Sequence, residues 1–176
     1  EIASAIESAG GQIDTFSGNN SHGVSVDILC EDFALGQATL LDVLLSPAFN
    51  KPEVDRERQS QLAAITQQRD HLLSHTLRQG RVLLYGENGY GLDPLGSGKL
   101  VEEFTSDQLK EHHRHLTAPG NTVIAVHGDI DPDQVSDEFL KATQNWPGAL
   151  PSFGTLELKQ LAKPSQKISE TNKEQS

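Results

Sequence analysis

A glycine pair followed by two alternating runs is the feature that most limits how this chain can fold. The stretch "AGGQIDTFSGNNSHGVSVDIL" places Gly10 and Gly11 directly after a helical pattern. Glycine takes the left-handed backbone conformation that ends many helices at low cost, so we expect the helix to stop there. Residues 12–17 and 24–29 then alternate side-chain character on either side of the turn-rich connector "GNNSHG", which predicts a β-hairpin.

Helical patterns dominate the rest of the chain. Apolar spacing and capping signals predict helices over residues 1–9, 33–45, 51–70, 72–84, 106–115 and 132–146. The run "TVIAVHGDI", residues 122–130, predicts a buried strand. Because the strands come partly as a hairpin and the helices come in a block, we expect an α+β fold with an antiparallel-rich sheet and helices packed on one face.

Charge and composition exclude several kinds of partner. The 176 residues carry a formal net charge of −11, and Lys and Arg are scattered along the chain. A phosphate-binding surface needs clustered basic side chains, so we expect neither nucleic acid nor a membrane as a partner. The single cysteine, Cys30, can form neither an internal disulfide nor a cysteine-based zinc site, and its alternating surroundings predict a buried strand thiol.

The two ends of the sequence suggest a piece of a longer protein. The chain contains no Met, opens on a helical pattern and closes on the polar run "KISETNKEQS". We expect one domain over residues 1–146, with an upstream part missing. The loose composition after Pro147 is typical of a linker, so residues 147–176 are expected to hold a linker and the start of the next domain.

Two histidine pairs are candidate metal ligands, and one glutamate is a candidate catalytic residue. In "EHHRH", His112 and His115 are three apart and could share a helix face, but a helix C-terminus is expected there, where imidazolium charge complements the helix dipole. We therefore predict a capping or surface role. His71 and His75 are four apart, yet the spacing specifies no third ligand, and we interpret them as a solvated face. Glu57 is solvated by default and is only a weak catalytic candidate.

Three longer stretches carry a family resemblance. They are "EIASAIESAGGQIDTFSGNNSHGVSVDIL", "LLDVLLSPAFNKPEVDRERQSQLAAI" and "YGENGYGLDPLGSGKLVEEFTSDQLKEHHRHLTAPGNTVIAVHGDID". Together they resemble the pitrilysin/insulinase-type zinc metallopeptidases, including relatives of the mitochondrial processing peptidase. The resemblance covers residues 1–146 and implies a half-domain of a clamshell, a homologous half or subunit as partner, and possible peptide substrates. It favours a bacterial periplasm or cell envelope, although the sequence itself does not fix the compartment.

The resemblance also says where zinc would be held. Active members use an inverted His-x-x-Glu-His helix and a glutamate on a later helix, and the inverted motif occurs nowhere in these residues. Aligning "RER" places Glu57 at an acidic position of the family and Ala64 at the ligand glutamate. An alanine methyl cannot bind zinc, and the neighbouring amides of Gln61, Gln67 and Gln68 are poor zinc ligands. We expect no metal ligand and no cofactor in this chain, whereas active relatives carry zinc.

The strand at residues 12–17 is the candidate peptide site. In the resembling family the corresponding strand pairs with extended substrate, and Asp14, Thr15, Phe16 and Ser17 occupy that region here. The leading hypothesis is a non-catalytic domain that helps to form a peptide-enclosing chamber.

Two alternatives stay open. One is an active zinc-dependent endopeptidase whose ligands lie upstream or at shifted positions, and the other is a purely structural assembly domain. In active members the inverted motif would lie upstream of these residues, so the sequence leaves open whether the whole protein is an enzyme.

Overall fold

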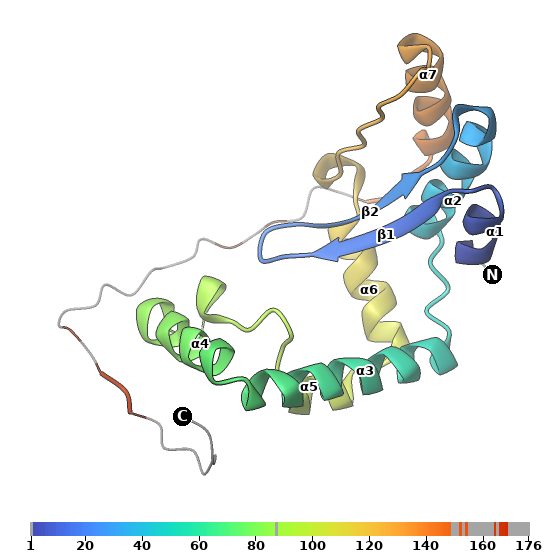
Figure 1. Cartoon of the computed structure of the whole chain (residues 1–176). Helices are drawn as coiled ribbons and strands as arrows, with labels where there is room; N and C mark the ends of the chain where they lie inside the picture. The colour runs from blue at the N-terminus through green and yellow to red at the C-terminus, as the bar shows by residue number, and fades with distance from the viewer. Residues whose placement is uncertain are drawn as a thin grey trace. The chain divides into compact units, whose positions relative to one another are not determined.

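The computed structural model describes residues 2–86, 88–148, 152, 154, 164 and 166–168. They fall into two units, of which unit 1 joins Glu1–Glu57 to Glu103–Phe153 and unit 2 joins Arg58–Glu102 to Gly154–Ser176 (Figure 1). The linker and next domain expected over residues 147–176 lie largely outside the described residues.

Unit 1 contains the hairpin and most of the helices. Its elements are α1 (Ile2–Ser8), β1 (Gln12–Ser17), β2 (His22–Asp27), the 3-10 turn η1 (Cys30–Asp32), α2 (Phe33–Leu45), the start of α3 (Lys51–Asp70), α6 (Ser106–Leu116), the 3-10 turn η3 (Pro119–Asn121) and α7 (Pro132–Thr143). Unit 2 contains the rest of α3, then α4 (Leu72–Tyr85), the 3-10 turn η2 (Gly89–Gly91) and α5 (Gly98–Glu103). The α+β class with antiparallel pairing is confirmed.

The glycine pair ends α1 as the sequence predicts. Gly10 has φ of 70°, and its N–H donates to the carbonyl oxygen of Glu7 at 3.0 Å. The N–H of Gly11 donates to the carbonyl oxygen of Ile6 at 2.9 Å, which completes a Schellman motif. A Cβ on Gly11 would lie 2.6 Å from the carbonyl oxygen of Asp27. Only glycine therefore lets the chain enter β1 this close to β2.

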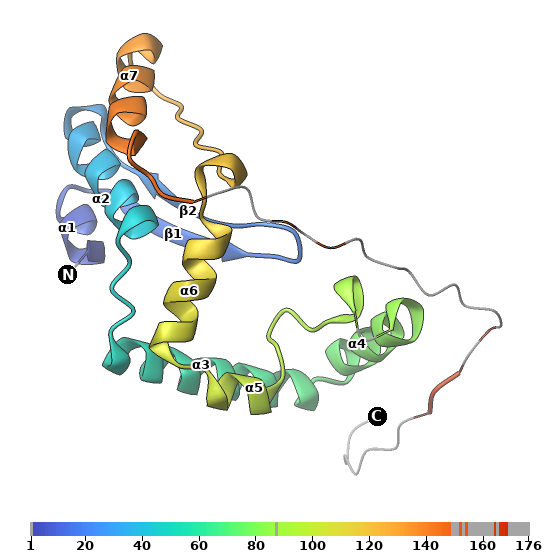
Figure 2. The same ribbon diagram turned by 180° about the vertical axis from the view of Figure 1, so that it is seen from behind.

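The hairpin is covered by helices on one face. Its antiparallel register runs from Gln12 opposite Asp27 to Ser17 opposite His22. Gly36 of α2 packs on this sheet, because a Cβ there would lie 3.5 Å from the side chain of Val26. Figures 1 and 2 agree in placing α1, α2 and α6 on the same face of the hairpin. The predicted packing of helices on one face is confirmed.

Caps at the two later helices of unit 1 also agree with the sequence. Thr105 and Gln108 form a reciprocal capping box at the start of α6. The carboxylate of Asp131 accepts hydrogen bonds from the N–H groups of Asp133 and Gln134 at 3.0 and 3.1 Å, where α7 begins.

The prediction of a buried strand over residues 122–130 is wrong. Within the described part of the chain this segment joins no strand ladder, and Val123 is 92% exposed. An extended run becomes a strand only when a neighbour pairs with its backbone, and no described residue does so. Ile124 and Val126 instead line, with α7, an open groove of about 650 Å³.

The prediction of a buried thiol at Cys30 is also wrong, because the side chain is exposed. The ladder ends at the pair of Gln12 and Asp27, where the turn at Gly11 takes the partner strand away. Cys30 therefore lies beyond the sheet and opens η1. None of the described helices is both long and apolar enough to cross a membrane.

Candidate functional site

The outer edge of β1 presents backbone groups that point away from β2. The N–H of Gly18 donates to the carbonyl oxygen of Ser21 at 2.8 Å, which makes these residues a hydrogen-bonded pair of the hairpin. Bonded and non-bonded pairs alternate along an antiparallel ladder, so the N–H and C=O groups of Ile13, Thr15 and Ser17 point outward. The described residues supply no third strand to pair with them. An edge of this kind is a template for an added extended chain.

The four predicted peptide-binding residues all lie on this strand and are exposed. Successive side chains of a strand point to opposite faces. Thr15 and Ser17 therefore lie on the helix-covered face with Ile13, while Asp14 and Phe16 lie on the open face. The sequence predicted the strand, and the structure adds the exposure of these side chains and their division between the two faces.

The open face combines an aromatic ring with carboxylates. Phe16 is 57% exposed. Asp14 accepts a hydrogen bond from Nε2 of Gln12 at 2.5 Å, and Asp27 lies across the ladder from Gln12. Neither Asp14 nor Asp27 forms an ion pair with another described residue. The open face of the hairpin is thus apolar at one position and negative beside it.

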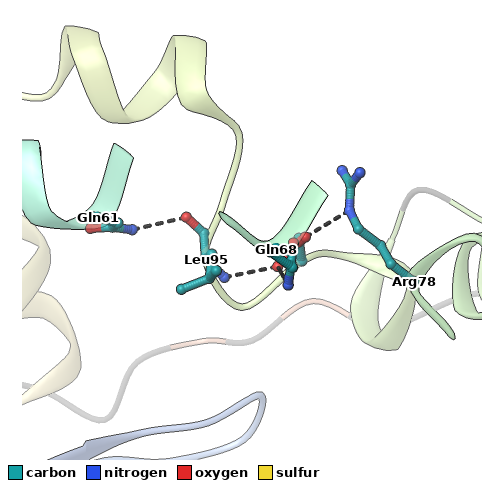
Figure 3. Close-up of polar contacts among 5 residues, drawn as sticks. Gln61, Gln68, Arg78 and Leu95 are labelled. Carbon is teal, nitrogen blue, oxygen red and sulfur yellow. Dashed lines mark hydrogen bonds and ion pairs between the residues drawn. The ribbon is translucent and has the colours of Figure 1, made fainter. Parts of the chain in front are cut away.

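In unit 2, a buried carboxylate anchors the glycine-bearing loop between α4 and α5. The side chain of Asp93 is 6% exposed, and its Oδ2 lies 2.6 Å from Nε of Arg78 (Figure 3). Its Oδ1 accepts hydrogen bonds from the N–H of Leu95 at 3.0 Å and from Nε2 of Gln68 at 3.4 Å. Sequence reasoning missed this cluster, although aspartate before proline in "LDPLG" is a turn signal that could have located the bend.

The same loop occupies the side of α3 on which Ala64 was placed as the missing ligand. Nε2 of Gln61 donates to the carbonyl oxygen of Leu95 at 2.9 Å (Figure 3). Gln61 and Gln68 are two helical turns apart, and Ala64 lies between them on that side of the helix. Both amides therefore hold the loop, and the residue between them offers only a methyl group.

Glu57 lies on the part of α3 that belongs to unit 1. Its side chain is 74% exposed, and Arg56 lies beside it, with Nε 3.7 Å from Oε1. The described part of the chain has no group of three or more His, Cys, Asp or Glu side chains placed to hold a metal ion. The weak catalytic interpretation of Glu57 stays a prediction.

Among the histidines of "EHHRH", the one that turns inward is His113. Its Nε2–H donates to the carbonyl oxygen of Leu44 at 2.8 Å, and its ring meets that of Phe49 edge-on with 5.8 Å between centroids. His115 lies in the last turn of α6 and His112 lies just before that turn, and both are exposed, so the prediction of a helix terminus is confirmed. Sequence reasoning selected the outward pair and missed the inward residue between them.

The two histidines of the second pair, His71 and His75, have different surroundings. His71 caps α4, because its Nδ1 accepts from the N–H of Ser74 at 3.4 Å. The ring nitrogens of His75 are buried and have no hydrogen-bond partner among the described residues. The solvated interpretation is therefore wrong for His75. It lies three residues before Arg78, on the side of α4 that faces the Asp93 loop.

The described residues of unit 1 form an α+β domain, with helices on one face of an antiparallel hairpin. Residues 103–176 match the family described as the peptidase M16 inactive domain. The chain is similar in structure to a peptidase M16 inactive domain from Pseudomonas fluorescens, with a TM-score of 0.76 and 21% identity over 89% of this chain and 38% of that one. A putative M16-like peptidase from Alicyclobacillus acidocaldarius gives a TM-score of 0.71 and 19% identity over 85% of this chain and 35% of that one.

A relative in sequence is a zinc protease, itself uncharacterized, of Streptomyces coelicolor. It is 26% identical over 142 residues, which are 77% of this chain and 29% of the relative. The chain thus spans about a third of the length of the proteins it matches. These findings confirm the resemblance to the M16, or pitrilysin-type, zinc metallopeptidases and support a non-catalytic, peptidase-like domain.

Proposed function

We propose that this domain forms one wall of a peptide-enclosing chamber together with a homologous M16-type half or subunit. In this proposal the outer edge of β1 receives the peptide as an added strand. The observation that carries it is the outward direction of the backbone groups of Ile13, Thr15 and Ser17, which no other described strand satisfies.

The strength of such pairing follows from the number of backbone bonds. Three residues offer three donors and three acceptors, and each intramolecular hydrogen bond contributes about 0.5–1.5 kcal/mol net. Association costs about 4 kcal/mol or more, so an isolated edge binds peptide with an affinity of about micromolar or weaker. An enclosing chamber would add to this by keeping the peptide near the edge.

The test uses hydrogen exchange of the full-length protein with and without an unstructured peptide. The amides of Ile13, Thr15 and Ser17 should exchange freely in the free protein and become protected when peptide is added. If these amides are already protected without peptide, β1 is an interior strand and the proposal is wrong.

A matched pair of variants at Thr15 adds a second measurement. Thr15→Pro removes an outward donor and leaves the hydrogen bonds between β1 and β2 in place, whereas Thr15→Ala keeps the donor. Thr15→Pro should weaken peptide capture much more than Thr15→Ala does.

One alternative has its own support, since the relatives in sequence carry the name zinc protease. An active endopeptidase would draw its ligands from outside these residues or from shifted positions. Zinc content and peptidase activity of the full-length protein separate this function from the non-catalytic one. A purely structural assembly domain would show no peptide-dependent protection of β1 at all.

A further inference from the structure

We propose that α4 carries an oxyanion-binding site, in which the guanidinium groups of Arg78 and Arg81 take a carboxylate or phosphate group. The site lies wholly within unit 2 and does not depend on the edge of β1. It is built from basic side chains that the proposed function does not use.

The charge of α4 differs in sign from that of the whole chain. The chain has a formal net charge of −11, yet residues 71–86 include two arginines and neither Asp nor Glu. A further cation reaches the helix from a distant part of the sequence, because Nζ of Lys167 donates to Oε1 of Gln79 at 2.6 Å. α4 is therefore a positive element of an acidic protein, and its charge attracts anions.

The two arginines are neighbours on one side of α4. The Cβ atoms of residues three apart on a helix lie about 5–6 Å from each other, so the stems of Arg78 and Arg81 are adjacent. His75, three residues before Arg78, extends the same row. Each guanidinium presents a planar fork of N–H donors that matches a carboxylate or phosphate, so two adjacent forks can hold one oxyanion.

Asp93 engages only one side of the Arg78 guanidinium. Its Oδ2 lies 2.6 Å from Nε, and Figure 3 shows the two terminal nitrogens of Arg78 directed away from that ion pair. No described residue accepts a hydrogen bond from these terminal nitrogens. The side chain is 29% exposed, so its free donors can meet a ligand from solvent while Asp93 fixes the direction in which they point.

Arg81 supplies the charge that no described residue balances. Its Nε is buried and has no hydrogen-bond partner within the described part of the chain, and it takes part in none of the ion pairs found there. The dipole of α4 favours a positive charge near the C-terminal end of the helix, but it provides no acceptor for this N–H. A buried donor without an acceptor destabilises the folded state, and an oxyanion bound side-on to Arg81 would satisfy it.

The buried ring nitrogens of His75 add unsatisfied polar atoms to the same row. Charge-assisted hydrogen bonds are about twice as strong as neutral ones, while partial exposure to solvent weakens them. We therefore expect about millimolar affinity for a small oxyanion, and a loss of about ten-fold when one guanidinium is removed.

The experiment is isothermal titration calorimetry of the full-length protein at constant ionic strength, which sodium chloride maintains. Inorganic phosphate is the first probe. Acetyl-Ala-Glu-Ala-amide is the second, and acetyl-Ala-Gln-Ala-amide is its uncharged control. Both peptides are blocked at their ends, so the Glu side chain carries the only carboxylate of the pair.

Three variants assign any binding to the proposed residues. Arg81→Met removes the fork and the charge, Arg81→Lys keeps the charge without the fork, and Arg69→Met removes the same charge from an exposed position in the last turn of α3. We expect Arg81→Met to weaken binding about ten-fold, Arg81→Lys to recover only part of the loss, and Arg69→Met to change affinity less than about two-fold.

Thermal unfolding without added anion checks that the variants fold. Because Arg81→Met removes an unsatisfied buried donor, its midpoint should equal or exceed that of the parent, whereas phosphate should raise the midpoint of the parent alone. If Arg81→Met lowers the midpoint, Arg81→Lys carries the comparison with Arg69→Met instead.

The two probes also identify the source of the oxyanion. Saturable binding of phosphate with equal, weak binding of both peptides supports a site for free phosphate, and tighter binding of the Glu peptide than of the Gln peptide supports a site for a peptide carboxylate. The inference is wrong if the parent binds neither phosphate nor the Glu peptide, or if Arg69→Met weakens binding as much as the variants of Arg81 do.

Discussion

The ring of Phe16 lies across the hairpin on Gly23, so closely that a Cβ on Gly23 would be 2.5 Å from ring atom Cε1. Glycine in a strand leaves a gap on the sheet and exposes backbone, and an aromatic residue on the neighbouring strand can fill that gap. The pair therefore fixes the position of an exposed ring without burying it. It also gives the hairpin a feature that can be measured directly.

Replacing the ring tests this contact. Phe16→Leu should lower the free energy of unfolding by less than about 1 kcal/mol, because the side chain is exposed and the ladder hydrogen bonds are kept. The Hα resonances of Gly23, shifted upfield by the ring in the parent, should return to ordinary positions. Unchanged Gly23 resonances in an NMR spectrum of the variant would contradict the contact.

Two glycines should respond to alanine in opposite directions. Gly11→Ala places a methyl group 2.6 Å from the carbonyl oxygen of Asp27, and we expect a loss of about 1–3 kcal/mol in unfolding free energy. Gly80→Ala, inside α4 with no atom within 4 Å of the new Cβ, should stabilise by about 0.5–1 kcal/mol. Urea denaturation of both variants checks the sign of each change.

The ion pair of Asp93 and Arg78 should matter more than an exposed pair. Asp93→Asn should cost about 1–3 kcal/mol, since Asp93 is 6% and Arg78 29% exposed and the arginine loses a partially buried partner. A double-mutant cycle with Arg78→Met isolates the coupling of the two side chains. Limited proteolysis within residues 86–98 should accelerate in Asp93→Asn, whereas unchanged cleavage would show that the cluster does not hold the loop.

Of the three histidines of α6, one should contribute to stability, and the other two should be replaceable at little cost in unfolding free energy. His113→Ala removes the hydrogen bond to the carbonyl oxygen of Leu44 and the contact with Phe49, and should cost about 1–3 kcal/mol. His112→Gln and His115→Gln should each cost less than about 1 kcal/mol and leave metal affinity unchanged. Thermal unfolding of the three variants, with and without divalent zinc, makes the comparison.

Introducing a carboxylate at position 64 should not create a zinc site. Catalytic zinc requires three protein ligands, and Ala64→Glu would supply only one. The two amides beside it, of Gln61 and Gln68, already hold the loop. Ala64→Glu in the full-length protein should therefore leave zinc content and peptidase activity at the parent level. Elemental analysis showing about one tightly held zinc per chain, in the variant or in the parent, would favour the endopeptidase alternative.

Local signals in the sequence were sufficient for most of the helices and for the hairpin. Gly10 and Gly11 end α1, Thr105 begins α6, and Asp131 begins α7, because capping and turn chemistry act over a few residues. The direction of the backbone N–H and C=O groups of Thr15 could not be read from the sequence. It follows from one hydrogen bond near the turn, between Gly18 and Ser21.

Features that depend on distant partners were not predictable in this way. Residues 122–130 have a strand-like pattern, but a strand requires a neighbouring chain, which the described residues do not provide. Spacing identified His112 and His115 as a pair, whereas burial of His113 depends on the end of α2, far away in the sequence. The cluster around Asp93 joins α3, α4 and a loop, so no single window of sequence contains it.

The Schellman motif at the end of α1 also limits the length of the open edge. The N–H of Gly11 would continue the outward row of β1, but it already donates to the carbonyl oxygen of Ile6. An added strand would therefore stop against α1 at that end, while at the other end the turn at residues 18–21 follows Ser17. A short peptide and a long one would thus share the same starting point, and extra length would overhang past the turn. Length would then change how far a ligand protrudes, without changing how many of its residues pair with β1.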